Sequence, residues 1–557
     1  MDVKADRPSS ATQIARTDPD WWRGAVIYQI YPRSFQDSNG DGIGDLAGIT
    51  ARLPYVADLG VDAVWLSPFF TSPMKDFGYD VSNYRDVDPI FGTLKDFDDL
   101  VAEAHRLGLK VMIDQVLSHT ADVHPWFVES RSSRDNDRHD WYVWADPNPD
   151  GTCPNNWLSV FGGSAWEWDG GRCQYYLHNF LTSQPDLNFH NPLVQDAILD
   201  DVRFWLERGV DGFRLDTVNY YFHDQRLRSN PPWDRSSGSR ADAPEVNPYG
   251  YQDHLYDKNR PENLRFLKRF RALLDQYPGS AAVGEVGESG KSIEIMADYT
   301  SGGDKLHMCY SFDFLGFGYG REFITSTVKR FEAGARGGWA CWAFSNHDVV
   351  RPATRFRERA ADPRRLAKVM GSLLLSLRGS VCLYQGEELG LTEADIAYED
   401  LVDPYGIRFW PEFKGRDGCR TPMVWEGGAT NGGFSPAKPW LPVPDEHLAM
   451  AVDRQDGDDG SVHAHFRRFL AFRRSHAILV KGAVEFLEAE HETIAFVRRH
   501  EGRAMLCLFN LSQEQARFEL GAGLKVTPVE GLGFAGTATE GAVTLEGIDA
   551  FFGMLEE

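Results

Sequence analysis

Short apolar segments alternate with longer amphipathic segments over most of the chain, and this alternation restricts the possible fold more than any other feature. The segments that predict strands are 26–35, 62–70, 109–119, 212–219, 281–286, 307–314, 339–348 and 380–390. Between them, segments such as 94–108, 194–209 and 263–277 predict helices. Eight strand-then-helix units predict an α/β fold in which parallel strands close into a TIM (β/α)8 barrel. The alternative is an open doubly wound sheet, which would need a glycine-rich phosphate turn after the first strand, and none is present.

Two long segments interrupt the alternation, and a change of pattern ends it. Residues 120–188 lack a helical period, which predicts a subdomain inserted after the third strand. Residues 220–260 follow the fourth strand, and loops of this length often form lids or binding walls. Alternating apolar residues near the C-terminus predict a small antiparallel β domain. We therefore expect a barrel of residues 1–119 and 189–478, an inserted subdomain of 120–188 and a C-terminal β-sandwich of 479–557.

The acidic composition limits the expected partners. The formal net charge of −24 disfavours nucleic-acid phosphates and anionic membranes, although solubility alone is the simpler reason for such a charge. The N-terminus has no apolar signal region, and no apolar run approaches the roughly 20 residues of a membrane span. Seven scattered cysteines without a CxxC pair predict free thiols and a cytoplasmic location. A loop disulfide between Cys153 and Cys173 is the alternative.

Charged side chains gather at the C-terminal ends of the predicted strands, which meet at one rim of a barrel, where reactive groups lie. The rim residues are Asp76, Tyr79, Asp80, Asp114, His119, Arg214, Asp216, Glu285, His347, Asp348, Glu387 and Glu388. Taken alone, a pair such as Arg214 and Asp216 is more often a structural ion pair. Several strands that end alike favour a reaction site, because clustered carboxylates raise one another's pKa and cost stability.

Carboxylates, histidines and an arginine without cysteine ligands suit glycoside cleavage. This reaction uses one carboxylate as a nucleophile and one carboxylic acid as a proton donor. Histidine and aspartate can bind sugar hydroxyls, and an aromatic ring such as that of Tyr79 can pack on the sugar face. A retaining enzyme would hold its two carboxyl groups roughly 5–5.5 Å apart.

Several motifs together resemble the α-amylase superfamily, glycoside hydrolase family 13. Its four signature regions are matched in order by DQVLSH (114–119), GFRLD (212–216), GE (284–285) and SNHD (345–348). Two further regions are matched by QPDLN (184–188) and YQGEELG (384–390). The segments WWRGAVIYQIYPRSFQDSNGDGIGDLAGI and GRDGCRTPMVW resemble the α-glucosidase and oligo-1,6-glucosidase branch. The resemblance extends over nearly the whole chain.

The resemblance implies a role for each matched residue. Asp216 would be the nucleophile, Glu285 the general acid and base, and Asp348 a third carboxylate that stabilises the transition state. Arg214 would orient Asp216 and keep it ionised. A glucose subsite would be lined by Asp76, Tyr79, His119 and His347. Arg416 would close this subsite against Asp76, with Arg420 as the alternative arginine.

Two neighbouring positions bear on substrate choice. Thr217 follows the implied nucleophile, and in this branch a threonine there resembles α-1,4-preferring enzymes, whereas valine resembles α-1,6-preferring ones. The loop 220–260 resembles a wall in relatives that accept short substrates, so we expect maltose-sized substrates. Ser118 stands where the wider family often has asparagine. We expect this difference to affect the support of a metal or of a domain interface rather than the chemistry.

The segment DSNGDGIGD (37–45) has oxygen-bearing residues at alternate positions. The side chains of Asp37, Asn39, Asp41 and Asp45 and the carbonyl of Ile43 suit Ca²⁺, with Mg²⁺ as a possibility. The EF-hand template fails at its twelfth position, which is glycine. Such a loop is often only a turn, but its resemblance to a structural Ca²⁺ loop in relatives implies a structural metal. We expect no catalytic metal and no organic cofactor.

Two other motifs carry less weight. GEVGESGKS (284–292) lacks the glycine that a phosphate loop needs six residues before its lysine, since Glu285 stands there and would repel phosphate. GLGFAG (531–536) matches GxGxxG, but no helix is predicted after it, so we interpret it as a chance match.

The expected function is that of a cytoplasmic, exo-acting, retaining α-glucosidase. It would release terminal α-1,4-linked glucose from short α-glucosides such as maltose through a covalent glucosyl–enzyme intermediate. A sucrose hydrolase or glucosyltransferase of the same family is the alternative, because water and sugar acceptors compete for the same intermediate. A non-catalytic carbohydrate-binding or transporter-accessory relative is a remote alternative, since such proteins usually lose the carboxylates found here.

Overall fold

The computed structural model describes residues 18–234, 236, 243–521 and 524–556. Two sequence predictions therefore fall partly outside the described residues. The N-terminal segment on which the absence of a signal region rests is residues 1–22, of which 1–17 lack a description, and the loop 220–260 lacks a description at 235 and 237–242.

Eight parallel strands form the centre of the molecule, each within a segment that the alternation predicts. They are β1 (Val26–Ile30), β2 (Ala63–Leu66), β5 (Lys110–Gln115), β9 (Gly212–Leu215), β10 (Ala281–Val286), β11 (Met308–Ser311), β12 (Cys341–Trp342) and β13 (Ser380–Tyr384). Their order is β11-β10-β9-β5-β2-β1-β13-β12. A parallel bridge between Cys309 and Ala340 brings the two outer strands together. The sheet is thus a nearly closed barrel, and the predicted fold is confirmed.

Successive residues of the barrel strands face opposite sides of the sheet, as the pleat requires. Ile27, Met112 and Tyr310 belong to a buried cluster that contains no residue of the surrounding helices. Tyr28 and Ile113 instead belong to the main core, which includes the apolar faces of those helices. The first cluster is therefore the barrel interior, and the second is the layer between strands and helices.

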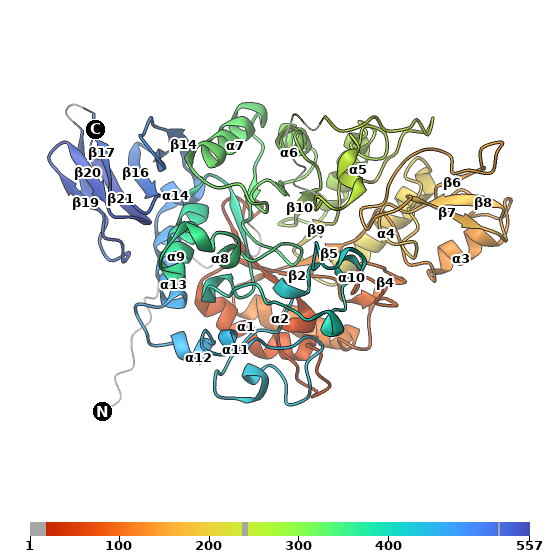
Figure 1. Cartoon of the computed structure of the whole chain (residues 1–557), viewed down its shortest axis with the longest axis horizontal. Coiled ribbons are helices and arrows are strands. Elements are labelled where there is room, and N and C mark those ends of the chain that lie inside the picture. Colours follow the sequence, from red (N-terminus) through yellow and green to blue (C-terminus); the bar gives the residue numbers. More distant parts are fainter. Residues whose placement is uncertain (1–17, 235, 237–242, 522–523, 557) are drawn as a thin grey trace.

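Helices follow the strands along the chain and surround the barrel (Figure 1). The longer ones are α1 (Leu46–Leu59), α2 (Leu94–Arg106), α4 (Pro192–Glu207), α5 (Asn263–Leu274), α6 (Ser292–Thr300), α7 (Arg321–Gly334), α9 (Pro363–Ser376) and α13 (Val462–Ser475). The shorter ones are α3 (Pro125–Ser132), α8 (Pro352–Arg355), α10 (Pro404–Phe409), α11 (Asp445–Leu448), α12 (Val452–Gln455) and α14 (Ala477–Lys481). Local sequence sets their starts: Thr93 and Asp96 form a capping box at α2.

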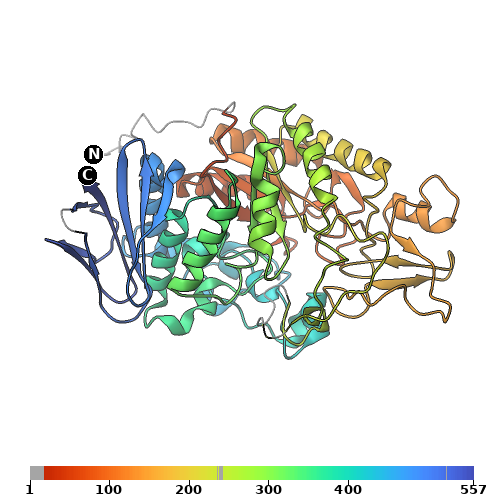
Figure 2. The ribbon, with the colours of Figure 1, turned by 90° about the horizontal axis from the view of Figure 1, so that it is seen from above.

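Two smaller β regions lie at opposite ends of the molecule, with the barrel between them (Figures 1 and 2). After β5, an antiparallel sheet joins β6 (Trp144–Ala145), β8 (Gln174–Leu177) and β7 (Trp166–Asp169). The C-terminal region has a five-stranded sheet of β14 (Ala483–Phe486), β15 (Thr493–His500), β16 (Arg503–Asn510), β21 (Asp549–Glu556) and β18 (Lys525–Pro528). Beside it is a three-stranded sheet of β17 (Ala516–Glu519), β20 (Ala542–Leu545) and β19 (Thr537–Thr539). A short pair, β3 (Phe70–Thr71) and β4 (Asn83–Val87), follows β2.

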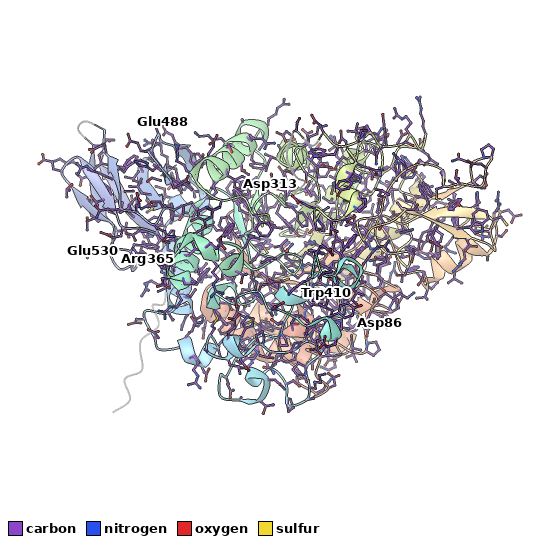
Figure 3. All side chains as sticks on the ribbon, viewed as in Figure 1. Asp86, Asp313, Arg365, Trp410, Glu488 and Glu530 are labelled. Carbon is purple, nitrogen blue, oxygen red and sulfur yellow. The ribbon has the colours of Figure 1, made fainter. Side chains whose placement is uncertain are left out.

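Side chains on the two ends of the molecule can be followed in Figure 3. Glu488 and Glu530 lie at the end formed by the C-terminal sheets, whereas Asp86 and Trp410 lie toward the other end.

All seven cysteines, Cys153 and Cys173 among them, are free thiols, so the alternative of a loop disulfide is wrong. Within the described ranges, no helix has both the length and the apolar character needed to span a bilayer.

Candidate active site

Arg214 lies fully buried in β9, at the centre of a group of carboxylates. Its Nη1 lies 2.8 Å from Asp114 and 2.6 Å from Asp216, and its Nη2 lies 2.5 Å from Glu285. These acids come from the ends of β5, β9 and β10, which are neighbours in the sheet. The carboxyl ends of three strands therefore converge on one guanidinium at the same rim of the barrel.

Tyr310 on β11 extends this network to a fourth strand. Its hydroxyl accepts hydrogen bonds from Nε and Nη2 of Arg214, at 3.1 and 2.9 Å, and donates one to Glu285 Oε1 at 2.9 Å. The sequence reasoning did not select Tyr310. The signal that could have found it is strand alternation, because Met308 and Tyr310 both face the barrel interior.

The turn after β9 places a backbone donor against Glu285. Thr217 has a φ of 41°, which is strained for a β-branched residue. Its N–H donates to Glu285 Oε2 at 3.2 Å, and its hydroxyl donates to Asp216 Oδ2 at 3.3 Å. Ser118, the residue that departs from the family pattern, lies 3.1 Å from the Thr217 hydroxyl and 2.9 Å from Nδ1 of His119. The strained turn thus connects the carboxyl groups of Asp216 and Glu285 to Ser118, which follows β5.

Burial dominates the acidity of this pair. It raises the pKa of Glu285 to about 7 and the pKa of Asp216 to about 7. Arg214 opposes both shifts, but its single charge is shared among three carboxylates and burial outweighs it. The expectation that Arg214 keeps Asp216 ionised therefore does not follow from this environment, because the pKa of Asp216 is raised. Near neutral pH the pair therefore retains a proton, which a general acid needs.

Asp348 has a different environment. Its Oδ1 lies 2.9 Å from Arg420 and 3.3 Å from Arg416, and its Oδ2 lies 3.2 Å from His347 Nε2. These neighbours hold the pKa of Asp348 well below its usual range despite burial. Its side chain is 19% exposed, against 8% for Asp216 and 4% for Glu285. Asp348 is therefore an ionised group at the more open side of the cluster.

The predicted contact between Arg416 and Asp76 is present, at 2.8 Å. Arg416 is itself held by Asp403 at 2.8 Å, a residue that the sequence reasoning missed. Burial raises the pKa of Asp76, and Arg416 opposes the shift. The alternative arginine, Arg420, also lies in the site. It contacts Asp348, the carboxylate that Arg416 contacts as well. Both arginines thus reach the site, and Arg416 is the one that joins Asp76.

Tyr79 and His119 complete the predicted set. The Tyr79 hydroxyl donates to Asp114 Oδ2 at 3.1 Å, and its ring stacks on His347 with centroids 5.3 Å apart. His119 Nε2 lies 3.0 Å from the Tyr79 carbonyl. Gln184, from the matched segment QPDLN, donates to Asp76 at 3.0 Å and lies 3.2 Å from His119. The structure therefore brings every predicted catalytic and substrate-binding residue into one connected network.

Aromatic side chains from three long connections lie beside this network. Phe180 of the inserted region lies 5.2 Å from His119 and 5.5 Å from Tyr220 between ring centroids. Phe161 lies under the guanidinium of Arg416 at 5.2 Å and contacts Tyr405 at 5.0 Å. The long segments found in the sequence thus supply apolar walls, although the sequence alone could not identify which aromatic residues do so.

Two rim residues point elsewhere. Glu388 accepts hydrogen bonds at 2.7 Å from the hydroxyls of Tyr28 and Tyr55, which belong to the layer between strands and helices. Asp80 accepts from the backbone of Lys75 and Asp76 and so braces the loop that carries Asp76. Their roles are structural.

The expected metal loop is ordered by its own backbone. Each of its four acidic or amide side chains accepts hydrogen bonds from nearby backbone N–H groups, as when Asp37 Oδ2 accepts from Gly42 at 2.8 Å. Asp45 caps α1 through Gly48. Among the described residues, no three or more His, Cys, Asp or Glu side chains form a group suited to a metal. The predicted ligand set also includes the amide of Asn39 and the carbonyl of Ile43, so Ca²⁺ in this loop stays a prediction.

Comparison with known proteins gives a consistent result. The family described as "Alpha amylase, catalytic domain" matches residues 29–482. A probable α-glucosidase from Rhizobium meliloti (strain 1021) is 62% identical over 547 residues, covering 98% of this chain and 99% of that protein. An oligo-1,6-glucosidase from Heyndrickxia coagulans is 37% identical, covering 90% of this chain and 94% of that protein.

Solved structures agree with the sequence relatives. An α-glucosyl transfer enzyme superimposes with a TM-score of 0.93 at 54% identity, covering 96% of this chain and 99% of that one. The trehalulose synthase of Pseudomonas mesoacidophila MX-45 has a TM-score of 0.86 at 30% identity, covering 96% and 99%. With the matched signature regions assembled at one rim of the barrel, the chain belongs to the α-amylase family and is a glycoside hydrolase.

Proposed function

We propose that this glycoside hydrolase is an exo-acting, retaining α-glucosidase that releases terminal α-1,4-linked glucose from short substrates such as maltose. The observation that carries the proposal is the sharing of one buried guanidinium by Asp216 and Glu285, at 2.6 and 2.5 Å. Two carboxyl groups bound to adjacent nitrogens of one arginine favour the short separation of retaining enzymes, about 5–5.5 Å, over the wider spacing of inverting ones.

In the proposed first step, Asp216 attacks the anomeric carbon while Glu285 donates its proton to the glycosidic oxygen. The bond from carbon to the leaving oxygen breaks, and a covalent glucosyl–Asp216 ester forms. In the second step, the Glu285 carboxylate takes a proton from water as the water oxygen attacks the anomeric carbon. The bond from that carbon to Asp216 breaks, which releases α-glucose and restores the Asp216 carboxylate. The raised pKa of Glu285 supports its role as the acid.

Exo-action is proposed from the ion pairs beside Tyr79 and His119. Arg416 contacts both Asp76 and Asp403, and we propose that these buried groups block one end of the glucose subsite. Asp348, ionised by two arginines, is suited to bind sugar hydroxyls and to offset developing positive charge. A substrate would then present only its terminal glucose to Asp216.

Transfer to a sugar acceptor is the second candidate activity. It is favoured by the 54% identical structure described as an α-glucosyl transfer enzyme. The partly exposed ring of Phe180, which contacts the buried rings of Phe161 and Tyr220, also supports it, because an acceptor could pack on this ring instead of water. Product analysis at high maltose separates the two activities. Oligosaccharide products indicate transfer, and glucose alone indicates hydrolysis.

A substrate panel tests the proposal. Glucose release is measured from maltose, isomaltose, sucrose, trehalose and soluble starch. We expect maltose to be the preferred substrate and starch to be poor. Release from none of the α-glucosides would contradict the proposed activity, and preference for sucrose would favour the alternative within the family.

Thr217→Val tests the proposed linkage preference. The change keeps the β-branched shape but removes the hydroxyl that contacts Asp216 and Ser118. We expect the ratio of kcat/KM for maltose to that for isomaltose to fall at least several-fold. An unchanged ratio, or a preference of the native protein for isomaltose, would refute the role of Thr217.

A cytoplasmic location is part of the same proposal. It is supported by the seven free thiols, since cysteines persist as thiols in reducing compartments. Cell fractionation with compartment markers tests it, and activity in an extracellular fraction of intact cells would contradict it.

A further inference from the structure

Gln29 is a fully buried amide in β1 that has no role in the proposed reaction. It lies two residues after Ile27, so its side chain shares the interior face of the barrel. Its Nε2 lies 2.7 Å from Nδ1 of His347 and 3.1 Å from the hydroxyl of Ser67. Its Oε1 has no hydrogen-bond partner among the described residues. A buried amide with one unsatisfied atom costs stability, so its orientation toward His347 requires a reason.

The neighbouring hydrogen bonds favour one position for the proton on His347. The Tyr79 hydroxyl has a single proton, which it donates to Asp114 Oδ2. The contact of 2.5 Å between the Tyr79 oxygen and His347 Nε2 therefore needs Nε2–H as its donor. In the neutral ring, Nδ1 must then accept, and the amide N–H of Gln29 is the group that faces it. The contact of Nε2 with Tyr79 and the contact of Nδ1 with Gln29 are thus both consistent with a neutral ring protonated at Nε2.

The charge state of His347 matters because of the groups around it. The ring is stacked between Tyr31 and Tyr79, with centroids 5.6 and 5.3 Å away. The charged groups that act on it are Asp348, Arg214, Arg416 and Arg420, and burial lowers its pKa well below the usual range. A protonated His347 would add a further cation where positive charge develops on the sugar.

We propose that Gln29 is a positioning residue that keeps His347 neutral and protonated at Nε2. Donation from the amide occupies Nδ1, the nitrogen that would otherwise take up a second proton. The Nε2–H is then available to the Tyr79 hydroxyl and to Asp348, which lies 3.2 Å away. The consequence for catalysis rests on the proposed glucosidase function, whereas the protonation state of His347 does not.

The protonation state is tested directly by long-range ¹H–¹⁵N spectra of protein labelled with ¹⁵N-histidine. The signals of His347 are those missing from H347N. We expect the native ring to be neutral with its proton on Nε2 from pH 5 to 8. In Q29E a carboxylate faces Nδ1, and we expect both nitrogens to be protonated. In Q29M, which has a similar shape and no donor, we expect a neutral ring whose Nδ1 has lost its hydrogen bond, so that the ¹⁵N signal of Nδ1 shifts relative to the native protein.

Kinetics test the consequence. We expect Q29E to lower kcat for maltose about tenfold or more at pH 6 and to move the acid limb of its pH profile upward. Q29M should lower kcat by less and leave the acid limb in place. A native ring protonated at Nδ1, or identical spectra in all three proteins, would overturn the inference even if no glucoside were cleaved. Equal losses of kcat with unshifted profiles would show that Gln29 only fills space. Thermal unfolding of each variant separates these outcomes from loss of the fold.

Discussion

Asp216 and Glu285 depend on each other because one arginine serves both. The three contacts of Arg214 with carboxylates fall between 2.5 and 2.8 Å, so removal of any one acid changes the charge that the others feel. The sequence placed both acids at strand ends and, through the matched motifs, assigned their roles. It could not show that burial would raise both pKa values, because burial depends on the inserted region and the long loops above the rim.

Replacement of the proposed nucleophile gives the first prediction. Asp216→Asn keeps the size of the side chain and its contact with Arg214 but cannot form the covalent ester. We expect maltose hydrolysis to fall by about 10³-fold or more with circular dichroism unchanged. The same substitution at exposed Asp86, near the other end of the molecule from the C-terminal sheets (Figure 3), should leave hydrolysis intact. Near-native activity of D216N would mean that the nucleophile is misassigned.

Glu285→Gln gives a prediction for stability against pH. The pKa of Glu285 rises from 4.5 to about 7 on folding, so the folded protein binds more protons than the unfolded chain between these values. Ionisation therefore costs the native protein stability as pH rises through this window, roughly 1.4 kcal/mol per pKa unit. We expect the Tm of E285Q minus the Tm of the native protein to increase from pH 4.5 to 7. Differential scanning calorimetry checks this, with Glu488→Gln on the exposed surface as the control. A Tm difference independent of pH would contradict the raised pKa.

The residues that the sequence reasoning missed act through other side chains of the site. Tyr310 meets Arg214 across 96 residues, and Gln184, which lies in the matched segment QPDLN, meets Asp76 across 108 residues. Asp403 meets Arg416 across 13 residues. Apart from the motif around Gln184, nothing in the local sequence marks them as polar partners of a site. Such residues are found only when strand alternation and the placement of loops are known.

The elements were easier to predict than their ends. All eight barrel strands lie within predicted segments, because buried parallel strands are nearly continuous apolar runs. The segment 339–348 contains only two residues of β12, Cys341–Trp342, since the chain leaves the sheet before it reaches His347. Apolar composition extends beyond backbone pairing there, so the pattern marks the element but not its bounds.

The loop at 37–45 gives a prediction at this scale. The sequence predicts structural Ca²⁺, whereas the side chains are already engaged by backbone N–H groups. We propose that the ion binds at those oxygens of the loop that accept no backbone hydrogen bond. We then expect CaCl₂ to raise the Tm and a chelator to lower it, with kcat unaffected at temperatures well below unfolding. Asp41→Asn should weaken this response, and titration calorimetry with Ca²⁺ and with Mg²⁺ would identify the metal. A Tm insensitive to both ions would show that the loop is only a turn.

At the scale of the whole molecule, a buried arginine joins the C-terminal sheets to the barrel. Arg498 on β15 is fully buried and donates to the carbonyls of Ser376 and Leu377, at the end of α9, at 2.6 and 3.0 Å. It also donates to the carbonyl of Gly482 at 2.7 Å. The C-terminal region therefore supports the barrel through groups that have no contact with the site.

Arg498→Met gives the prediction for this interface. The substitution retains much of the side-chain volume but leaves several buried carbonyls without a donor. We expect a loss of about 3 kcal/mol in the free energy of unfolding, with kcat/KM for maltose unchanged at 25 °C. Arg499→Met, at the neighbouring exposed position paired with Glu485, should cost less than about 1 kcal/mol. A similar loss of unfolding free energy in both variants would show that the buried contacts of Arg498 contribute no more than the exposed ion pair of Arg499.

The pairing of β1 with β13 has a consequence for synthesis on the ribosome. The N–H of Gly24, just before β1, meets the hydroxyl of Ser380 across 356 residues, and Val26 pairs with Val381. A nascent chain that has just exposed Glu285 already carries three acids of the cluster, yet it lacks the neighbour of its first strand and the arginines that steady Asp348. Translation must therefore pass Arg420 before the ion pairs of Asp348 can form. If the proposed function holds, the order of synthesis keeps an incomplete chain from acting on its substrate.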